Sequence, residues 1–423
     1  MARAILFATI LIDFVGFSIL LPVLPTYLQR QGYSGGEVGL ILALYVIGLV
    51  IFLPFWGWIS DRVGRRPVIL LCLLGTSASF AGLVVAASLA AFCVARLLGG
   101  FFGASVGTAQ AYVTDITDEE GRAHGLALLG GAAGGGMVLG PALGGILGGI
   151  HELLPIYVPA LLALGNAVLA AFFLPESRRD TIRPARSQPI LPALIPTPLL
   201  LLLRAHDNRT RTYLYLFFHI FAAFAALEAM FPLYARAALG WGVLETGLFL
   251  GYLGLAMGLT QGLAVGRATA AVGEVPLVVV GLALSGTCLL TLAAARSTPA
   301  LALLGLGVAL GNGLYLPTFT SLFSKHCGEE TRSGEYLAQS QSMLNTGRGV
   351  GFLWGGWALE RLGLTAPFVL GGIGILLALG IFAVGVRYLV PRPSLTSGHR
   401  ETPEIRYSPV SRGGGAKEPR RSQ

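Results

Sequence analysis

The sequence predicts an all-α membrane protein in which twelve transmembrane helices form two pseudo-symmetric six-helix bundles. Only 12% of the 423 residues are charged, whereas about a quarter of a soluble domain is charged. Apolar runs of about 20 residues, the length that crosses a bilayer, recur from end to end. A polar stretch divides these runs into two sets of six, and the two sets resemble each other in sequence.

This composition excludes a soluble enzyme, a nucleic-acid-binding protein and a disordered scaffold. We interpret the net charge of +8 as a sign of how the chain is oriented in the membrane, because Lys and Arg gather on the cytoplasmic side of membrane proteins. The 59 glycines agree with close helix packing in lipid. The cysteines, which are Cys72, Cys93, Cys288 and Cys327, form no metal-ligand or disulfide pattern. We therefore expect no metal ion and no cofactor.

The apolar runs define the helices and the domains. The predicted spans are 4–28, 36–59, 68–88, 90–113, 124–149, 154–174, 211–235, 244–265, 276–295, 299–323, 337–359 and 365–390. The N-terminal bundle is thus 1–174 and the C-terminal bundle 211–390, joined by a Pro- and Arg-rich cytoplasmic loop at 175–210. Residues 391–423 have no apolar period, and we expect a disordered cytoplasmic tail.

Basic residues set the predicted orientation. With the N-terminus inside, the inner segments hold Arg3, Arg62, Arg65, Arg66, Arg122, Arg178, Arg179, Arg183, Arg186, Arg204, Arg209, Arg211, Arg267, Lys325 and Arg332, and the tail adds Arg392, Arg406, Lys417 and Arg420. The outer loops hold only Arg30, Arg236, Arg296 and Arg361. This asymmetry predicts that both termini are cytoplasmic.

An internal repeat supports the division into two halves. Glu37, Gly39 and Leu40 recur 208 residues later in VLETGLFL, as Glu245, Gly247 and Leu248. Glycines of the fifth span recur in the eleventh: Gly136, Gly140, Gly144 and Gly145 match Gly347, Gly351, Gly355 and Gly356. The loop that follows the second span is repeated only in part, as GRATAAVGEVP, without its acidic and double-basic core.

That loop carries the most specific motif of the chain. It reads GWISDRVGRRP and contains Gly57, Asp61, Arg62, Gly64, Arg65 and Arg66. A carboxylate and three guanidiniums packed this closely can bridge neighbouring helix ends in one conformation only, or they can serve as a plain cytoplasmic anchor. The fifth span reads GMVLGPALGG, where Gly136, Gly140, Pro141, Gly144 and Gly145 give a flat, kinkable helix face for close packing.

The loop resembles the G-x-x-x-D-R-x-G-R-[RK] signature of the major facilitator superfamily. LIDFVGFSILLPVLP, ARLLGGFFGA and GMVLGPALGG are similar to first-, fourth- and fifth-helix motifs of that superfamily's drug–proton antiporters. Residues 1–175 thus resemble the tetracycline-resistance and multidrug–proton antiporters, and the second half resembles only the general fold. The resemblance implies that Asp115 joins Asp61 and Arg65 in a cytoplasmic gate. No acid stands in the third or ninth span, where tetracycline pumps typically carry one.

Four charged residues lie deep in predicted spans, and such residues are functional candidates by default: Asp13, Arg96, Glu228 and Arg348. We interpret them as proton-coupling residues. Asp13 and Arg96 form either a proton-coupling pair or a permanent structural pair. Glu228 binds protons or a cationic substrate, or is a plain cavity-wall acid. Arg348 either pairs with Glu228 or Asp13, or holds an anionic substrate.

Aromatic and amide side chains at other span positions are candidates for a substrate cavity, although aromatics at helical spacing are more often plain packing. The candidates are Phe17, Tyr45, Gln110, Tyr112, Phe217, Tyr252, Gln261, Tyr315 and Asn345. Repeated bundles of this kind place the substrate site between the halves, near the midplane.

The resemblance implies a secondary active transporter that exports a small amphipathic organic compound or drug in exchange for protons by alternating access. A symporter or uniporter of an endogenous metabolite on the same fold is the alternative. A transport-dead sensor or scaffold is a further one, and an enzyme is not expected. The expected partners are a small-molecule substrate, protons and the lipid bilayer, with no nucleic acid. We expect a monomer in the plasma or inner membrane, and an organelle membrane stays open.

Overall fold

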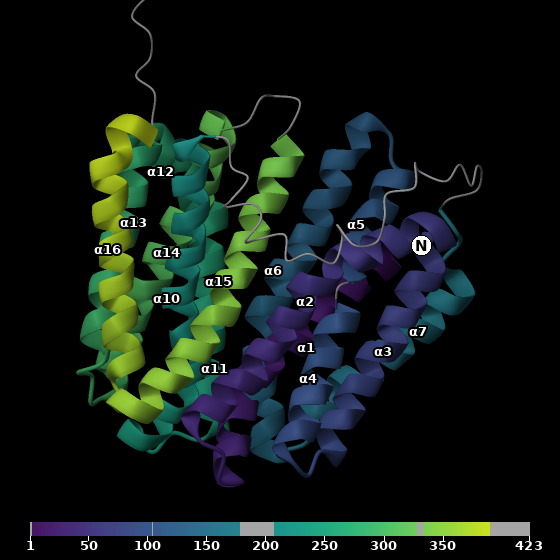
Figure 1. Cartoon of the computed structure of the whole chain (residues 1–423), viewed down its shortest axis with the longest axis horizontal. Helices are drawn as coiled ribbons and strands as arrows, with labels where there is room; N and C mark the ends of the chain where they lie inside the picture. Colours follow the sequence, from purple (N-terminus) through teal and green to yellow (C-terminus); the bar gives the residue numbers. More distant parts are fainter. Residues whose placement is uncertain (1, 104, 178–206, 328–332, 390–423) are drawn as a thin grey trace, which may run out of the picture. The chain divides into compact units, whose positions relative to one another are not determined.

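The computed structural model describes residues 2–103, 105–177, 207–327 and 333–389, and within these ranges the secondary structure is helical (Figure 1). The first half contains α1 (Ala2–Arg30), α2 (Gly35–Val63), α3 (Arg65–Val85), α4 (Leu89–Gly103), α5 (Ser105–Ile116), α6 (Glu119–Ile150) and α7 (Leu154–Phe173). The second half contains α10 (Asn208–Leu239), α11 (Val243–Leu259), the π-helical turn η1 (Thr260–Ala264), α12 (Val265–Val272), α13 (Glu274–Leu292), α14 (Thr298–Cys327), α15 (Ser333–Leu362) and α16 (Ala366–Leu389).

The predicted fold class is confirmed. Eleven stretches of the described chain are long and apolar enough to cross a bilayer. One of them covers α4 and α5 together, and another covers α11, η1 and α12. The remaining predicted span, 337–359, forms most of α15, which is the most polar of the long helices. Most of the predicted central loop and all of the predicted tail lie outside the described residues.

Local sequence explains where several helices begin. Ser34 and Glu37 form a capping box at the start of α2, with each side chain accepting a hydrogen bond from the other's backbone N–H. Asp118 and Asp207 accept the N–H groups of Gly121 and Thr210 and so cap α6 and α10. Between α2 and α3, Gly64 has φ 108°, a conformation that favours glycine and turns the chain sharply.

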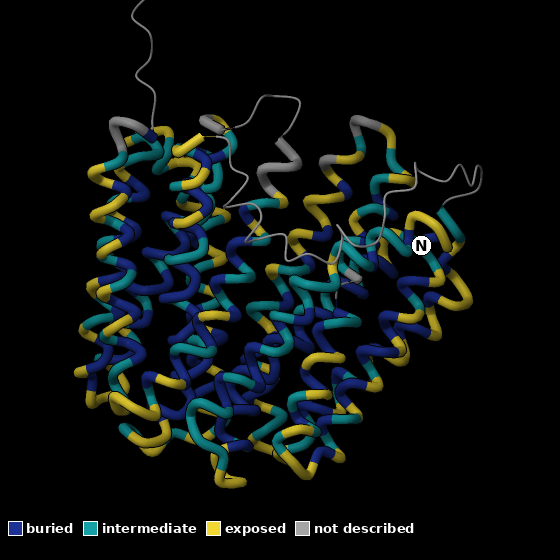
Figure 2. Tube along the Cα trace, in the orientation of Figure 1, coloured by how far each residue is buried: buried dark blue, intermediate teal, exposed yellow. Residues whose placement is uncertain are grey.

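The outer surfaces of the helices are apolar, as a lipid environment requires. Leu161, Phe172, Leu303 and Val384 are 66%, 79%, 70% and 85% exposed. Large apolar side chains with this exposure mark a surface that faces something other than water. Figure 2 shows buried residues where helices meet, and exposed residues on outward faces and helix ends. The chain is a multi-pass integral membrane protein.

Within each half, the repeated glycines let two helices lie in close contact. A Cβ at Gly136 would lie 3.0 Å from the carbonyl oxygen of Leu11 in α1, and one at Gly144 would collide with that of Ile19. The equivalent Gly347 and Gly351 lie against the backbone of α10 at Phe218 and Ala222. The flat face predicted for the fifth span therefore packs on α1, and the face of α15 packs on α10.

Between the halves, the same repeat forms two equivalent contacts. A Cβ at Gly145 in α6 would lie 2.8 Å from the Cα of Gly247 in α11. In the equivalent place, a Cβ at Gly356 in α15 would lie 3.1 Å from the Cα of Gly39 in α2. All four glycines lie in the helix halves predicted to be external. Only glycines at these positions allow the two backbones to come this close.

Candidate functional site

Asp13 and Arg96 line one small cavity inside the first half. Both are buried, with 6% and 3% exposure. Tyr45, Thr76 and Ser79 also line this cavity, which has room for about one water molecule. Nε and Nη2 of Arg96 have no hydrogen-bond partner among the described residues. The cavity therefore places a carboxylate and a guanidinium in one compartment with little access to solvent.

An aromatic pair lies between this cavity and the second half. The Tyr45 ring is 4.6 Å from the guanidinium carbon of Arg96 and is stacked on the Phe17 ring, with 5.1 Å between ring centroids. The guanidinium carbon of Arg348 lies 5.6 Å from the Phe17 centroid. The stacked pair therefore contacts the arginine of the first half through Tyr45 and the arginine of the second half through Phe17.

Glu228 of α10 and Arg348 of α15 form an ion pair. The distance from Nε of Arg348 to Oε2 of Glu228 is 3.1 Å, and the side chains are 16% and 12% exposed. Nη2 of Arg348 donates a hydrogen bond of 3.4 Å to Oε1 of Glu228, whereas Nε and Oε2 form an ionic contact without a hydrogen bond. Of the partners considered for Arg348, the structure pairs it with Glu228. This pairing explains how α15 lies among apolar helices despite its polar sequence.

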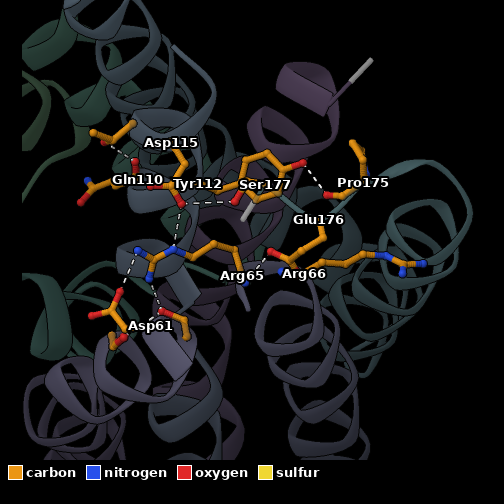
Figure 3. A network of polar contacts seen from close by, with 12 residues as sticks. Asp61, Arg65, Arg66, Gln110, Tyr112, Asp115, Pro175, Glu176 and Ser177 are labelled. Atoms are coloured by element: carbon orange, nitrogen blue, oxygen red, sulfur yellow. Dashed lines mark hydrogen bonds and ion pairs between the residues drawn. The ribbon is translucent and has the colours of Figure 1, made fainter. Parts of the chain in front are cut away.

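At the predicted cytoplasmic end, Arg65 is the centre of a polar network (Figure 3). Its guanidinium lies 2.8 Å from Asp61, at the end of α2, and 3.1 Å from Asp115, at the end of α5. It also donates a 2.6 Å hydrogen bond to Ser60 Oγ. The predicted contact of Asp61, Arg65 and Asp115 is present, and its role as a gate stays a prediction. Arg62 lies outside the network, over the ring of Trp58 at 3.6 Å.

The segment after α7 completes this network, which sequence reasoning missed. The Glu176 carboxylate accepts the backbone N–H groups of Arg65 and Arg66, at 2.9 and 3.1 Å, and so caps the start of α3. Ser177 Oγ donates to Asp115, and Tyr112 Oη donates to the carbonyl oxygen of Pro175 (Figure 3). The sequence placed Glu176 in a loop 111 residues from Arg65, so only the adjacency of α3 and α7 reveals the contact.

The second half has a charge-inverted counterpart of this network. Lys325, at the end of α14, lies 2.8 Å from Glu274, at the start of α13. These positions follow Asp115 and Arg65 by 210 and 209 residues, and both values lie between the offsets of 208 and 211 seen in the internal repeat. The second copy of the loop lacks the sequence motif, yet an ion pair joins the equivalent helix ends with acid and base exchanged.

The structure brings together only some of the predicted cavity residues. Phe17 and Tyr45 line the Asp13 cavity, whereas Tyr112 and Gln110 lie at the Arg65 network (Figure 3). The other candidates are dispersed. Phe217 packs on Phe319 and Phe323, Tyr252 is 37% exposed, Gln261 lies in η1, Tyr315 is buried on α14, and Asn345 is on α15.

The predicted antiporter helix motif serves packing. Gly136, Gly140 and Gly144 contact α1, and Ser18 of α1 donates a 2.9 Å hydrogen bond to the carbonyl oxygen of Gly136. Gly145 and the Pro141 carbonyl contact Gly247 of the other half. The motif therefore connects the helix that carries Asp13 with the interface between the halves.

The chain is similar to proteins named as resistance proteins and transporters. A class E tetracycline resistance protein of Escherichia coli is 30% identical over 349 residues, which cover 78% of this chain and 81% of that protein. Multidrug resistance protein 1 of Bacillus subtilis is 27% identical over 77% of this chain and 82% of its own length. The crystal structure of the human organic anion transporter MFSD10 (TETRAN) matches with a TM-score of 0.67 and 25% identity, covering 90% of this chain and 98% of that one.

The family model described as "Major Facilitator Superfamily" matches residues 6–267 and 239–422. The two matches together cover most of the chain, including all four buried charges and both helix-end networks. The chain belongs to the major facilitator superfamily, resembles its tetracycline-resistance and multidrug transporters, and is a transporter of small molecules rather than an enzyme.

Proposed function

We propose that the protein exports small amphipathic organic compounds in exchange for protons by alternating access. The observation that carries this proposal is the shared cavity of Asp13 and Arg96. In such a compartment, loss of water favours the neutral acid and the neighbouring cation favours the ionised one. Movement of a helix or arrival of substrate shifts this balance, so that the carboxyl group takes up or releases a proton.

The contacts between the halves support an alternating mechanism. Glu360 Oε2, at the end of α15, accepts the Gly36 N–H of α2 at 3.0 Å, and the glycine contacts of Gly39 and Gly145 lie toward the same end. This is the predicted external end. At the other end lie the Arg65 and Lys325 pairs, which hold helix ends within each half. A closed external end and a separate network at the cytoplasmic end fit a carrier that opens to one side at a time.

The names of similar proteins support drug-like substrates, with one competing class. The bacterial relatives are named for resistance to tetracycline and to multiple drugs. The human structural relative is named an organic anion transporter, and this name supports organic anions as the competing substrate class. The second candidate function is a symporter or uniporter of an endogenous metabolite. We propose the plasma or inner membrane as location, with both termini cytoplasmic and a single chain as the working unit.

Flux in proteoliposomes under an imposed pH gradient tests the proposal. Ethidium, tetracycline and fluorescein represent a planar cation, the relatives' drug and a planar anion. An antiporter accumulates its substrate against the direction of proton flow, and reversing the gradient reverses the accumulation. Accumulation along with protons would establish a symporter, and flux that ignores the gradient would establish a uniporter; either result contradicts antiport. A variant ending at residue 390 tests the scaffold alternative, since a transporter is expected to keep its flux.

A further inference from the structure

A flat guanidinium lies in a slot built from one carboxylate and two aromatic rings. Arg348 is 5.6 Å from the centroid of Phe17, which belongs to the first half, and 5.7 Å from that of Phe221, which belongs to the second. The third wall is the Glu228 carboxylate, 3.1 Å from Nε. Phe221 and Glu228 are seven residues apart on α10, which places them on one helix face. Both rings are buried, at 7% and 8% exposure.

Each wall of this slot attracts positive charge. Ring faces carry the negative part of the aromatic quadrupole and attract cations. A carboxylate with so little access to water needs a cation beside it. An organic cation can replace Arg348 without leaving Glu228 unpaired and while keeping both ring contacts. An organic anion would have to break the ion pair and then lie against two ring faces and a carboxylate.

We propose that Arg348 is a tethered competitor: it fills a binding slot for a planar organic cation, and the substrate enters by displacing it from Glu228. The proposal rests on the transport function proposed above and names its substrate class. Arg348 thereby becomes a specificity-determining residue, because only a ligand that pairs better with Glu228 and the two rings than the arginine does can enter.

The displaced guanidinium has a second carboxylate within reach. Asp13 and Phe17 are four residues apart on α1, so Asp13 lies on the same face one turn, about 5.4 Å, away. When Arg348 moves from Phe17 to Asp13, its charge favours the ionised carboxylate, and a protonated Asp13 gives its proton to water. Tyr45, Cys72 and Arg96 also face Asp13 from α2, α3 and α4. The organic cation brings one positive charge into the site and Asp13 releases one proton, so the net charge of the site is unchanged.

Binding to the purified full-length protein in detergent tests the slot without any proton gradient. Ethidium is the planar cation, and fluorescein is the planar anion of similar size. If Arg348 occupies the slot nine-tenths of the time, Arg348→Gln lowers the Kd for ethidium about tenfold. Ethidium then raises the Tm of this variant more than that of the wild type, because it supplies the missing partner of Glu228.

The matched variants separate the slot from general damage. Arg348→Lys keeps the charge and is expected to bind ethidium nearly as the wild type does. Glu228→Gln loses ethidium binding. Arg296→Gln, at a loop arginine that donates to Tyr234, is the control for loss of a positive charge outside the slot. Ethidium binding releases a proton from the wild type and none from Arg348→Gln, which binds without moving a charge to Asp13.

Three results overturn the proposal. One is weaker ethidium binding by Arg348→Gln, and another is binding of ethidium by neither protein. The third is fluorescein binding to the wild type that Arg348→Gln abolishes, which would make Arg348 the direct partner of an anionic substrate. Because the assay uses no gradient, these results differ from a failure of proton-driven flux, which would contradict the proposed antiport and leave the slot intact.

Discussion

Glu228 and Arg348 are each less than a fifth exposed and lie 3.1 Å apart, so protein groups rather than water stabilise both charges. The hydropathy pattern alone predicted these two residues as functional candidates, because they are charged residues within apolar spans. Their partners could not be predicted, since Arg348 had three candidates and the choice depends on α10 packing against α15. The same packing decided which predicted cavity residues meet. Phe17 and Tyr45 meet, whereas Tyr112 lies at the other network.

Removing one member of the Glu228–Arg348 pair is expected to destabilise the protein strongly. Glu228→Gln and Arg348→Gln each leave an uncompensated buried charge, which costs about 3–5 kcal/mol. The double variant leaves none, so its loss in the free energy of unfolding is expected to fall well below the sum of the two single losses. The free energy of unfolding of the wild type, the two single variants and the double variant is measured in detergent with a fluorescent probe. Losses that simply add would show that the two charges do not interact.

At the outer end of α15, Glu360 makes a pH-dependent contact with α2. Hydrogen bonds from the Ser34 side chain and the Gly36 N–H, together with the charge of Arg361, lower the pKa of Glu360 below its ordinary value of 4.5. The ionised Glu360 therefore stabilises the folded protein at pH values above 4.5. This stabilisation is lost as the pH falls through the lowered pKa and the carboxylate is protonated. The Tm difference between the wild type and Glu360→Gln is expected to vanish in acid. A difference that stays constant with pH contradicts this role.

The glycine face of α6 packs on α1, the helix that carries Asp13. The network at the helix ends holds Asp61, Arg65 and Asp115 in contact. The repeat of Gly136, Gly140 and Gly144 predicted a close helix contact, because small residues every fourth position leave a flat surface. It did not identify α1 as the partner. The Glu176 contact was missed because a loop acid has no periodicity. The charge-inverted pair of Glu274 and Lys325 was missed because sequence comparison scores exchanged charges as mismatches.

The α1–α6 contact leaves no room for a methyl group at Gly144. A Cβ there collides with the Ile19 carbonyl oxygen, and backbone cannot move aside as a flexible side chain can. Gly144→Ala is expected to lower the free energy of unfolding by about 1–3 kcal/mol. Gly134→Ala is the matched control on the same helix, because a Cβ there meets nothing within 4 Å. Equal stability of the two variants in thermal unfolding would contradict the close contact.

The inverted helix-end pairs give the two halves opposite charges at equivalent positions. Repeat-equivalent α1 and α10 contact each other, and rocking brings equivalent helix ends together where the carrier closes. There, Asp115 would face Lys325. The exchange Glu274→Lys/Lys325→Glu keeps the pair within the second half but places like charges across the closing end. At about 1 kcal/mol for each attraction or repulsion, the facing pair changes by about 2 kcal/mol, so transport is expected to fall about thirtyfold while the Tm is kept.

The neutral variant Glu274→Gln/Lys325→Gln is the matched control for this exchange. It removes the pair without introducing repulsion, so its flux is expected to lie between those of the wild type and the exchanged variant. Flux in proteoliposomes and the Tm in detergent are measured for all three proteins. Wild-type flux by the exchanged variant would show that the pair serves only the second half.

At the scale of the whole molecule, the internal repeat accounts for the architecture. Gly145 against Gly247 and Gly39 against Gly356 are two copies of one contact, so the interface follows the symmetry visible in the sequence. The fold was predictable because span length, the repeat and the loop motif agree. The substrate slot was not, because Phe17 of one half meets Arg348 of the other only after both bundles pack.

The proposed antiport depends on proton coupling through Asp13. The most direct measurement compares the wild type with Asp13→Asn in proteoliposomes, recording both accumulation driven by a pH gradient and exchange of internal for external substrate without a gradient. Asp13→Asn is expected to lose accumulation but to keep exchange, since substrate binding and alternation remain and only the proton is removed. Gradient-driven accumulation that persists in Asp13→Asn would mean that protons are not coupled through this carboxylate.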